Sequence, residues 1–313
     1  MELALLDKVR QCVRGEILLS EPLKNHTTYR VGGAAEVLVR PRTPAEAARL
    51  YALAKRSGIP LTVIGAGSNV IAPDEGIAGI VIATKGSFAK VSYAGKDTVR
   101  AEAGVALIDL AAAVARRGLG GLEPISCIPG TVGGAVVMNA GTREGDTGAV
   151  VTRVGVCTPP GRARVFEVRE LGFGYRTSVL ARSDWLVLWT EFRLTPADPR
   201  AVLGAMEAMR RERCEKYPLE TPSAGSVFKR PPGAYAGRLI EMSGCKGMRV
   251  GDAIVSTQHA NFIVNAGAAT ASDILELIAR VRRTVYERTG TFLELEQIPL
   301  GGHASSGGRA HSG

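Results

Sequence analysis

A glycine turn at residues 65–69, with the sequence Gly-Ala-Gly-Ser-Asn, directly follows the apolar run at 61–64. A phosphate loop of the Rossmann type reads G-x-G-x-x-G and leads into a helix. Here Val70 stands at the third glycine position, and the next regular segment, 79–82, is again apolar and strand-like. This part of the chain is therefore predicted to form strand, loop and strand, which disfavours the usual dinucleotide-binding fold.

A second glycine-rich segment lies at 127–141, where small residues leave the backbone open to a ligand. Taken alone, the first loop could be a tight turn that joins two strands. Two such loops in one chain can instead hold a large dinucleotide from both sides, with backbone N–H groups around a pyrophosphate and Ser68 and Asn69 as added donors. The candidate binding residues are Gly65, Ala66, Gly67, Ser68, Asn69, Val70, Pro129, Gly130, Thr131, Gly133 and Gly134.

Local signals predict helices and strands along the rest of the chain. A capping box, with Thr43 as the cap and Glu46 three residues later, starts a helix that ends near Ser57. An apolar stripe from Ser272 predicts an amphipathic helix that Gly290 ends. Further helices are expected at 106–117, 201–216 and 236–242, and strands at 99–103, within 151–194, at 261–264 and at 292–298.

Charge and composition limit the classes of function open to the 313 residues. Lys and Arg number 39 against 30 Asp and Glu, and the formal charge of +9 suits anionic small molecules or nucleic acid. Because the sequence has neither aromatic interleaving nor a long basic run, anionic small molecules suit this charge equally well, and charge alone does not decide between the two classes. Five widely spaced cysteines without a C-x-x-C pair, and four histidines, two of them in the 301–313 tail, disfavour a zinc site, a disulfide framework and a catalytic metal.

No part of the sequence predicts a membrane span or export. The uncharged stretches at 124–142 and 253–272 contain too many Gly, Asn and Gln residues for a membrane-spanning helix. The first residues lack the basic and then apolar pattern of a secretory signal. We therefore expect a soluble cytoplasmic protein. Its tail at 301–313, which is Gly, Ser and His without periodicity, is expected to be disordered.

Several polar residues could carry chemistry, and each also has a simpler explanation. Arg176, at a strand end in Phe-Gly-Tyr-Arg, could be a solvated surface group. Ser226 lies in Ala-Gly-Ser-Val-Phe-Lys, which lacks the second glycine of the hydrolase elbow G-x-S-x-G, and it could cap a turn or helix. Glu294 and Glu296 are two apart on a predicted strand and should share a face, where exposed carboxylates are common. His259 lies in a polar turn, where a histidine is usually exposed.

In their order along the chain, these segments resemble the UDP-N-acetylenolpyruvoylglucosamine reductase family, flavoproteins that complete UDP-N-acetylmuramate for peptidoglycan. No single motif is specific, but the ordered set, which covers roughly residues 20–300, is specific. The matching segments are His-Thr-Thr-Tyr-Arg-Val-Gly-Gly at 26–33, the loop at 65–70, the second glycine segment at 128–139, Phe-Gly-Tyr-Arg at 173–176, Ala-Gly-Ser-Val-Phe-Lys at 224–229, His-Ala-Asn-Phe-Ile-Val-Asn at 259–265 and Leu-Glu-Leu-Glu at 293–296.

The resemblance implies an α+β protein with a two-lobed FAD-binding domain of the vanillyl-alcohol oxidase and cresol methylhydroxylase type, followed by a C-terminal α+β substrate-binding domain. The lobes are expected at 1–85 and 86–198, and the substrate domain at 199–300. By similarity, both glycine loops hold FAD, and NADPH and UDP-N-acetylglucosamine enolpyruvate are the small-molecule substrates. Neither nucleic acid nor a membrane is expected as a partner, and the chain is expected to be a monomer.

The same resemblance assigns roles to individual residues. Arg176 and Glu296 would stabilise the enolic intermediate, and Ser226 would be the proton donor. An arginine suits the first role because its guanidinium is always cationic and forks onto two oxygens. A serine can act as an acid only when it is positioned against a strongly basic, carbanion-like centre. The substrate-side positions that align with the family are Tyr175, Arg230 and His259.

Two other functions remain open at this point. One is a flavin oxidase of the same fold that acts on a sugar or alcohol and passes electrons to O₂. The other is a non-catalytic protein that binds a nucleotide or nucleic acid through its basic surface. Longer members of the family close the substrate site with an inserted tyrosine-bearing loop. The segment between Arg176 and Ser226 has no room for that loop, so the chain is expected to be of the shorter type.

Overall fold

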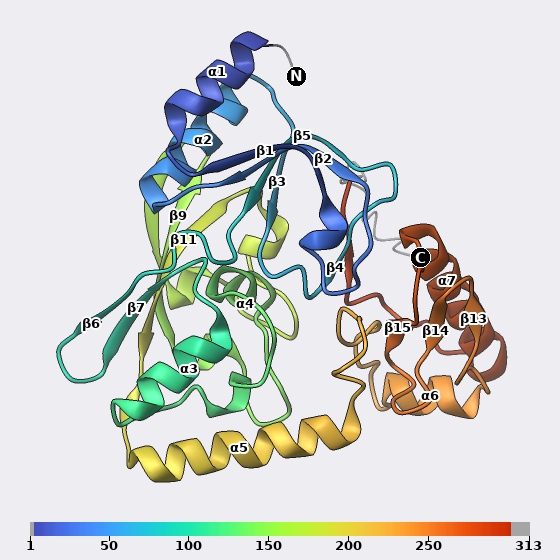
Figure 1. The fold of residues 1–313 in the computed structure, drawn as a ribbon. Coiled ribbons are helices and arrows are strands. Elements are labelled where there is room, and N and C mark those ends of the chain that lie inside the picture. The colour runs from blue at the N-terminus through green and yellow to red at the C-terminus, as the bar shows by residue number, and fades with distance from the viewer. Residues whose placement is uncertain (1–2, 302–313) are drawn as a thin grey trace, which may run out of the picture.

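The computed structural model describes residues 3–301, and Figure 1 shows them as two groups of elements. The larger group contains two sheets with their helices. The smaller group, at the right of Figure 1, contains α6 (Ala236–Met242), α7 (Ala271–Thr289) and a small sheet. Within residues 3–301, no helix is long and apolar enough to cross a membrane. The disordered tail expected from residue 301 lies, from 302 onward, outside the described residues.

The first sheet has the strand order β1-β2-β5-β3. β1 pairs antiparallel with β2, whereas β5 pairs in parallel with both β2 and β3. β5 is buried along almost its whole length, as expected for a central strand with parallel neighbours. The helices α1 and α2 pack against each other, and α2 also packs against β3. The bounds are α1 (Leu3–Cys12), β1 (Glu16–Pro22), β2 (Ala34–Arg40), α2 (Pro44–Arg56), β3 (Leu61–Ile64) and β5 (Ile77–Ala83).

The second sheet is antiparallel throughout and has the order β10-β9-β11-β7-β6. The short helix α4 packs against β11 and β7 and so brings the second glycine segment onto this sheet. Its elements are β6 (Val91–Ala94), β7 (Thr98–Glu102), α3 (Leu107–Arg116), α4 (Val132–Met138), β9 (Val151–Thr158), β10 (Arg162–Glu167) and β11 (Leu186–Arg193). Short 3-10 helices lie at Leu23–Asn25, Glu123–Ile125, Thr147–Ala149, Val168–Glu170 and Leu180–Arg182.

The long helix α5 (Pro199–Lys216) runs along the lower edge of Figure 1 from the second sheet toward the C-terminal elements. It packs against α3 and against β8 (Leu119–Gly120), which pairs with β12 (Thr195–Pro196). Beyond it, α7 packs against an antiparallel sheet of β13 (Arg249–Val250), β14 (Ala253–Val255) and β15 (Ile263–Asn265).

The end of the described chain returns to the first sheet's neighbourhood. β16 (Ile298–Pro299) pairs in parallel with β4 (Val70–Ile71), which directly follows the first glycine turn. The expected strand at 292–298 is therefore wrong in its extent. Leu295 instead makes an isolated bridge with Phe228, so the segment changes partner around residue 296. This change of partner brings Glu296 close to the glycine turn.

Buried apolar side chains form one large core and two smaller ones. The large core joins both sheets, with Val37 and Ile80 from the first and Val99 and Phe192 from the second. The C-terminal core lies between α7 and its sheet and extends to Tyr29. The third core lies around the first sheet and is the smallest of the three.

Capping signals located the helix ends correctly. The Thr43 side chain accepts from the Glu46 N–H at the start of α2, and Gly290, with φ of 69°, ends α7. The strand, loop and strand expected around the first glycine turn are also confirmed. The helix α4 was not predicted, because two consecutive glycines disfavour a helix. In the structure Thr131 caps its start and the buried sheet supports it.

Candidate active site

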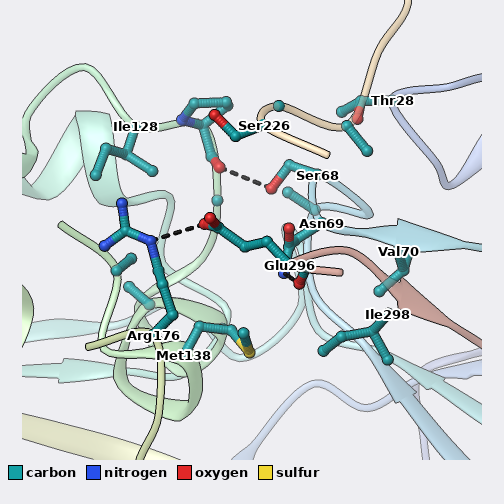
Figure 2. Close-up of a pocket in the computed structure, with 18 of the residues that line it drawn as sticks. Thr28, Ser68, Asn69, Val70, Ile128, Met138, Arg176, Ser226, Glu296 and Ile298 are labelled. Atoms are coloured by element: carbon teal, nitrogen blue, oxygen red, sulfur yellow. Dashed lines mark hydrogen bonds and ion pairs between the residues drawn. The ribbon is translucent and has the colours of Figure 1, made fainter. Parts of the chain in front are cut away.

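A cavity of about 1320 Å³ lies between the glycine loops and the C-terminal elements. Every residue that the sequence analysis assigned to FAD, substrate or catalysis lines this cavity, whereas Glu294 does not. The lining residues come from segments up to 231 positions apart, Gly65 to Glu296. Figure 2 shows Arg176, Ser226 and Glu296 around the same space. The structure thus brings the residues together, and their individual roles stay predictions.

Arg176 and Glu296 form an ion pair at the centre of this group. Arg176 Nε donates to Glu296 Oε1 at 2.7 Å, and its Nη2 donates to the carbonyl oxygen of Gly141, also at 2.7 Å. Both side chains are mostly buried, with exposed fractions of 20% and 13%. Glu294, two residues before Glu296, is instead 69% exposed and pairs with Lys229. The two carboxylates therefore have different environments, and the exposed-surface explanation for Glu296 is wrong.

The backbone and charge state of this pair are both unusual. Arg176 has φ of 54°, a left-handed conformation that non-glycine residues adopt only at a cost of order 1–3 kcal/mol. Such strained positions cluster at functional sites. Burial raises the pKa of Glu296, and although Arg176 acts in the opposite direction, the carboxyl keeps a pKa above its usual value. Glu296 is therefore closer to a proton donor than an exposed glutamate would be.

Glu296 is held by main-chain contacts on both sides. Its N–H donates to the carbonyl oxygen of Val227 at 2.8 Å, and its own carbonyl accepts from Asn69 Nδ2 at 3.2 Å. Two residues further on, the N–H of Ile298 donates to the Asn69 carbonyl oxygen at 2.9 Å. These contacts fix residues 296–298 to the first glycine loop on one side and to the extended segment around Val227 on the other.

Ser226 lies on an extended segment that is anchored at its neighbours. Ser226 makes an isolated bridge with Phe262, and the Val227 N–H donates to the Asn261 carbonyl at 2.9 Å. The hydroxyl of Ser226 has no hydrogen-bond partner among residues 3–301, and the residue lines the cavity. Its proton is therefore available to a ligand in the cavity and is not committed to the protein.

The two glycine loops contact each other directly. Ser68 Oγ donates to the carbonyl oxygen of Pro129 at 2.7 Å (Figure 2). Asn69 Nδ2 donates to Glu296, as described above. Ser68 and Asn69 are predicted to donate to a pyrophosphate, and that role stays a prediction. In the structure both side chains donate to the protein and line the cavity, and their contacts join the loops and hold Glu296.

The glycines of the loops fall into two classes. A Cβ atom at Gly65 would lie 2.7 Å from Thr131 Oγ1, and one at Gly67, where φ is 66°, would lie 2.1 Å from the carbonyl oxygen of His26. These two positions need glycine for packing. A Cβ at Gly130 or Gly134 would have no protein atom closer than 3.5 Å, and both residues line the cavity. Glycine at these two positions leaves room for a ligand.

These observations fit a flavin dinucleotide. Two glycine loops border one cavity that is large enough for an extended ligand, since small-molecule sites usually measure about 300–1,000 Å³. The cavity also has room for a substrate beside the flavin, because it extends past the loops to Ser226 and the C-terminal elements. Within residues 3–301 no cluster of three His, Cys, Asp or Glu residues could hold a metal ion.

The substrate-side candidates lie at the C-terminal part of the cavity. The Arg230 N–H donates to Tyr175 Oη at 3.2 Å, and the Arg230 guanidinium lies over the Tyr235 ring at 4.1 Å. His259 lies among aromatic rings, with its centroid 4.8 Å from that of Tyr217. Burial, and next the charge of Lys246, lower the pKa of His259, which favours the neutral ring near pH 7.

The sequence analysis missed two residues, Tyr235, which lines the cavity, and Gln297, which follows Glu296. Tyr235 is 57% exposed and lines the cavity, and an aromatic residue just before the predicted 236–242 helix was the only signal for it. Gln297 is 2% exposed and follows Glu296 directly. Nothing in a single sequence distinguishes that glutamine from a surface residue.

Comparison with known protein families divides the chain in the same way as the fold. The family described as "FAD binding domain" matches residues 35–167. The family described as "UDP-N-acetylenolpyruvoylglucosamine reductase, C-terminal domain" matches residues 217–298. The first match contains both glycine loops, and the second contains Ser226, His259 and Glu296.

Similar proteins extend over almost the whole chain. The UDP-N-acetylenolpyruvoylglucosamine reductase 2 of Symbiobacterium thermophilum is 46% identical over 95% of this chain and 96% of its own. The UDP-N-acetylenolpyruvoylglucosamine reductase of Moorella thermoacetica is 46% identical over 94% of this chain and 96% of its own. The crystal structure of the enzyme of that name from Thermus caldophilus matches with a TM-score of 0.76 and 40% identity, over 91% of this chain and 98% of its own.

Proposed function

Because the chain belongs to the UDP-N-acetylenolpyruvoylglucosamine reductase family, we propose that it reduces UDP-N-acetylglucosamine enolpyruvate to UDP-N-acetylmuramate with NADPH and FAD, in peptidoglycan precursor synthesis. Its fold is an FAD-binding domain of the vanillyl-alcohol oxidase type followed by the C-terminal domain of this family. The observation that carries the proposal is that one cavity joins both glycine loops to Arg176, Ser226 and Glu296.

The loops supply the cofactor side of the cavity. FAD bound there would supply the hydride chemistry, the transfer of hydride from NADPH to the terminal carbon of the enolpyruvyl double bond. The backbone of the two loops would hold the pyrophosphate, with the open positions of Gly130 and Gly134 against it. Ser68 keeps the loops at a fixed separation through its bond to the Pro129 carbonyl.

Arg176 and Glu296 act on the substrate carboxylate. When hydride reaches the terminal carbon, the electron pair of the double bond moves toward the carboxylate, which becomes an enolate. The guanidinium of Arg176 stabilises this charge, and its geometry is set in advance by Glu296 and the Gly141 carbonyl. The Glu296 carboxylate keeps the guanidinium in place by accepting from Arg176 Nε, and burial raises the pKa of this carboxyl, so it takes up a proton more readily than an exposed glutamate. Preorganised groups of this kind cost no reorganisation when the charge develops.

Ser226 completes the reaction as general acid. Its uncommitted hydroxyl donates its proton to the carbon next to the carboxylate, which forms the new C–H bond and neutralises the enolate. The serine then recovers a proton from water. Only this second half of the reaction requires Ser226, because reduction of the flavin by NADPH needs no proton from the substrate side.

This division gives the test of the function. In stopped-flow measurements, Ser226→Ala should leave flavin reduction by NADPH unchanged and nearly abolish reoxidation of the flavin by the enolpyruvyl sugar. Ser92→Ala, at an exposed position of β6 outside the cavity, should behave as wild type in both halves. Equal loss in both halves for Ser226→Ala would refute the assignment of the proton donor.

The same measurements separate the rival functions. A flavin oxidase would reoxidise rapidly with O₂ and would not respond to the enolpyruvyl sugar. A non-catalytic nucleotide-binding protein would be colourless after purification and could not be reconstituted with FAD. The likeness to reductases along almost the whole chain supports the reductase over both rivals.

Several finer features are part of the same proposal. The chain is of the shorter family type, since residues 177–225 contain only a short 3-10 helix, β11, β12 and α5 among their regular elements. We place the FAD lobes at 1–85 and 86–198 and the substrate domain at 199–300, with the last strand β16 returning to the first lobe. The enzyme acts in the cytoplasm as a monomer. Sedimentation of the purified protein tests the last point.

A further inference from the structure

The side chain of Gln297 makes three hydrogen bonds in a position that is 2% exposed. Its Nε2 donates to the carbonyl oxygens of Ala224 and Gly225, at 3.2 and 3.1 Å. Its Oε1 accepts from Tyr29 Oη at 3.1 Å. Both amide protons and the amide oxygen are therefore used, and the two carbonyls that they reach belong to the residues just before Ser226.

The orientation of this amide is determined by its neighbours. The two carbonyl oxygens can only accept hydrogen bonds, so the edge of Gln297 that faces them must be the NH₂ group. The opposite edge must then be the oxygen, which needs a donor. Tyr29 supplies it, because the residue is fully buried and burial raises the pKa of its hydroxyl well above the usual value. The Tyr29 hydroxyl thus keeps the proton that it donates to Gln297 Oε1.

These bonds act on the backbone just before Ser226, whereas the Phe262 bridge and the Val227 N–H hold the segment at and after Ser226. Gly225 has φ of 73° and no side chain, so rotation about its backbone would move the following hydroxyl. Gln297 holds the carbonyls of Ala224 and Gly225, and the adjacent Glu296 N–H holds the Val227 carbonyl. Ser226 is therefore held on both sides by the two residues 296 and 297, one of which is the predicted partner of the substrate carboxylate.

We propose that Gln297 is a positioning residue that sets the place of the Ser226 hydroxyl relative to Glu296, and that Tyr29 fixes the orientation of the Gln297 amide. This inference rests on the proposed function, in which Ser226 delivers the proton. Neither Gln297 nor Tyr29 lines the cavity, so neither side chain contacts a ligand there directly. A displacement of about 1 Å at a reacting group can cost about 10²-fold in rate.

The test uses the flavin-loaded enzyme and three variants. Gln297→Met keeps the length of the side chain and removes the amide. Tyr29→Phe removes only the hydroxyl that orients it. The matched control is Tyr51→Phe, because Tyr51 is also fully buried and its hydroxyl donates to a backbone carbonyl, that of Asp184, at 3.0 Å. Each variant is assayed for flavin content, melting temperature, the rates of both half-reactions, and the solvent isotope effect on the second half.

We expect flavin reduction by NADPH to stay within twofold of wild type in all three variants. The second half-reaction should fall about 100-fold in Gln297→Met and less in Tyr29→Phe, and its solvent isotope effect should rise in both, because proton transfer becomes slower than the other steps. Tyr51→Phe should lower the melting temperature without changing either half-reaction or the isotope effect.

Three results would overturn the proposal. One is a normal second half-reaction in Gln297→Met. Another is an equal loss in both half-reactions. The last is slowing of the second half with an unchanged solvent isotope effect, which would indicate general damage to the site. Failure of the proposed function has a different signature, because the wild-type reduced flavin would then not be reoxidised by the enolpyruvyl sugar at all, and this would overturn the positioning role as well.

Discussion

The two classes of glycine in the cofactor loops predict opposite effects of the same substitution. At Gly130 an alanine methyl group would have only one protein atom within 4 Å, Ser68 Oγ at 3.7 Å, and it would lie at the cavity. Folding should therefore tolerate Gly130→Ala. The methyl group would instead occupy space next to the bound pyrophosphate. Overpacking of this size costs roughly 1–3 kcal/mol, which corresponds to about 5- to 150-fold weaker FAD binding.

Gly65→Ala should have the reverse effect. Its methyl group would lie 2.7 Å from Thr131 Oγ1, the atom that accepts the Gly134 N–H and caps α4. Moving Thr131 away would break that cap, at about 1 kcal/mol. A loss of that size lowers the melting temperature of a protein by roughly 2–4 °C.

The assay compares flavin-free preparations of both variants with wild type, because bound FAD would itself raise the melting temperature. Melting temperatures give the cost to folding, and titration of FAD fluorescence gives the dissociation constant. Gly130→Ala should melt like wild type and bind FAD more weakly, and Gly65→Ala should melt lower. The reasoning is refuted if Gly130→Ala binds FAD with wild-type affinity, or if its flavin-free form loses as much stability as Gly65→Ala.

Two further predictions concern single contacts. Arg176→Lys keeps the charge but cannot reach Glu296 and the Gly141 carbonyl together. The second half-reaction should therefore fall about 10²–10³-fold in stopped-flow assays, and near-normal turnover would contradict the role of Arg176. Asp74 accepts from the N–H groups of Ala271 and Ser272 at the start of α7, and Asp74→Ala should cost about 1 kcal/mol of unfolding free energy at pH 7. Burial raises the pKa of Asp74, but hydrogen bonds from Ser272 and Ala271 outweigh it and keep the pKa below its usual value. The stabilisation by Asp74 is complete above the usual pKa of an aspartate and is lost as the pH falls through its lower pKa in the folded protein. Unfolding free energies of wild type and variant from denaturant titrations should therefore converge at low pH. A difference in unfolding free energy that stays constant with pH would argue against the cap.

Local signals predicted α2 and α7 because the causes of their ends are local, whereas α1 was not predicted. The cap of α2 needs only Thr43 and Glu46, three residues apart, and the end of α7 needs only a glycine that can adopt a positive φ. The helix α4 was missed because its support is not local. It is stabilised where the chain packs on the second sheet, which outweighs the poor helix propensity of its glycines.

The expected strand at 292–298 failed for a related reason. Alternating apolar residues indicate which face a strand would bury, but they do not name its partner. In the structure Leu295 bridges to Phe228, whereas Ile298 pairs with Val70 on another sheet. Glu296 lies at the change of partner and contacts Arg176 there.

For this chain, residue types and their order were enough to identify the glycine loops, the helix ends and, through the family resemblance, the residues that the reaction would need. Only the folded chain decided what those residues touch. Arg176 and Glu296 are 120 positions apart, and Tyr29 and Gln297 are 268 apart. Such contacts depend on the burial of many unrelated side chains at once, which brings distant segments to one place. The sequence specifies which hydrogen-bond donors and acceptors each residue carries, and packing determines which of them bond to one another.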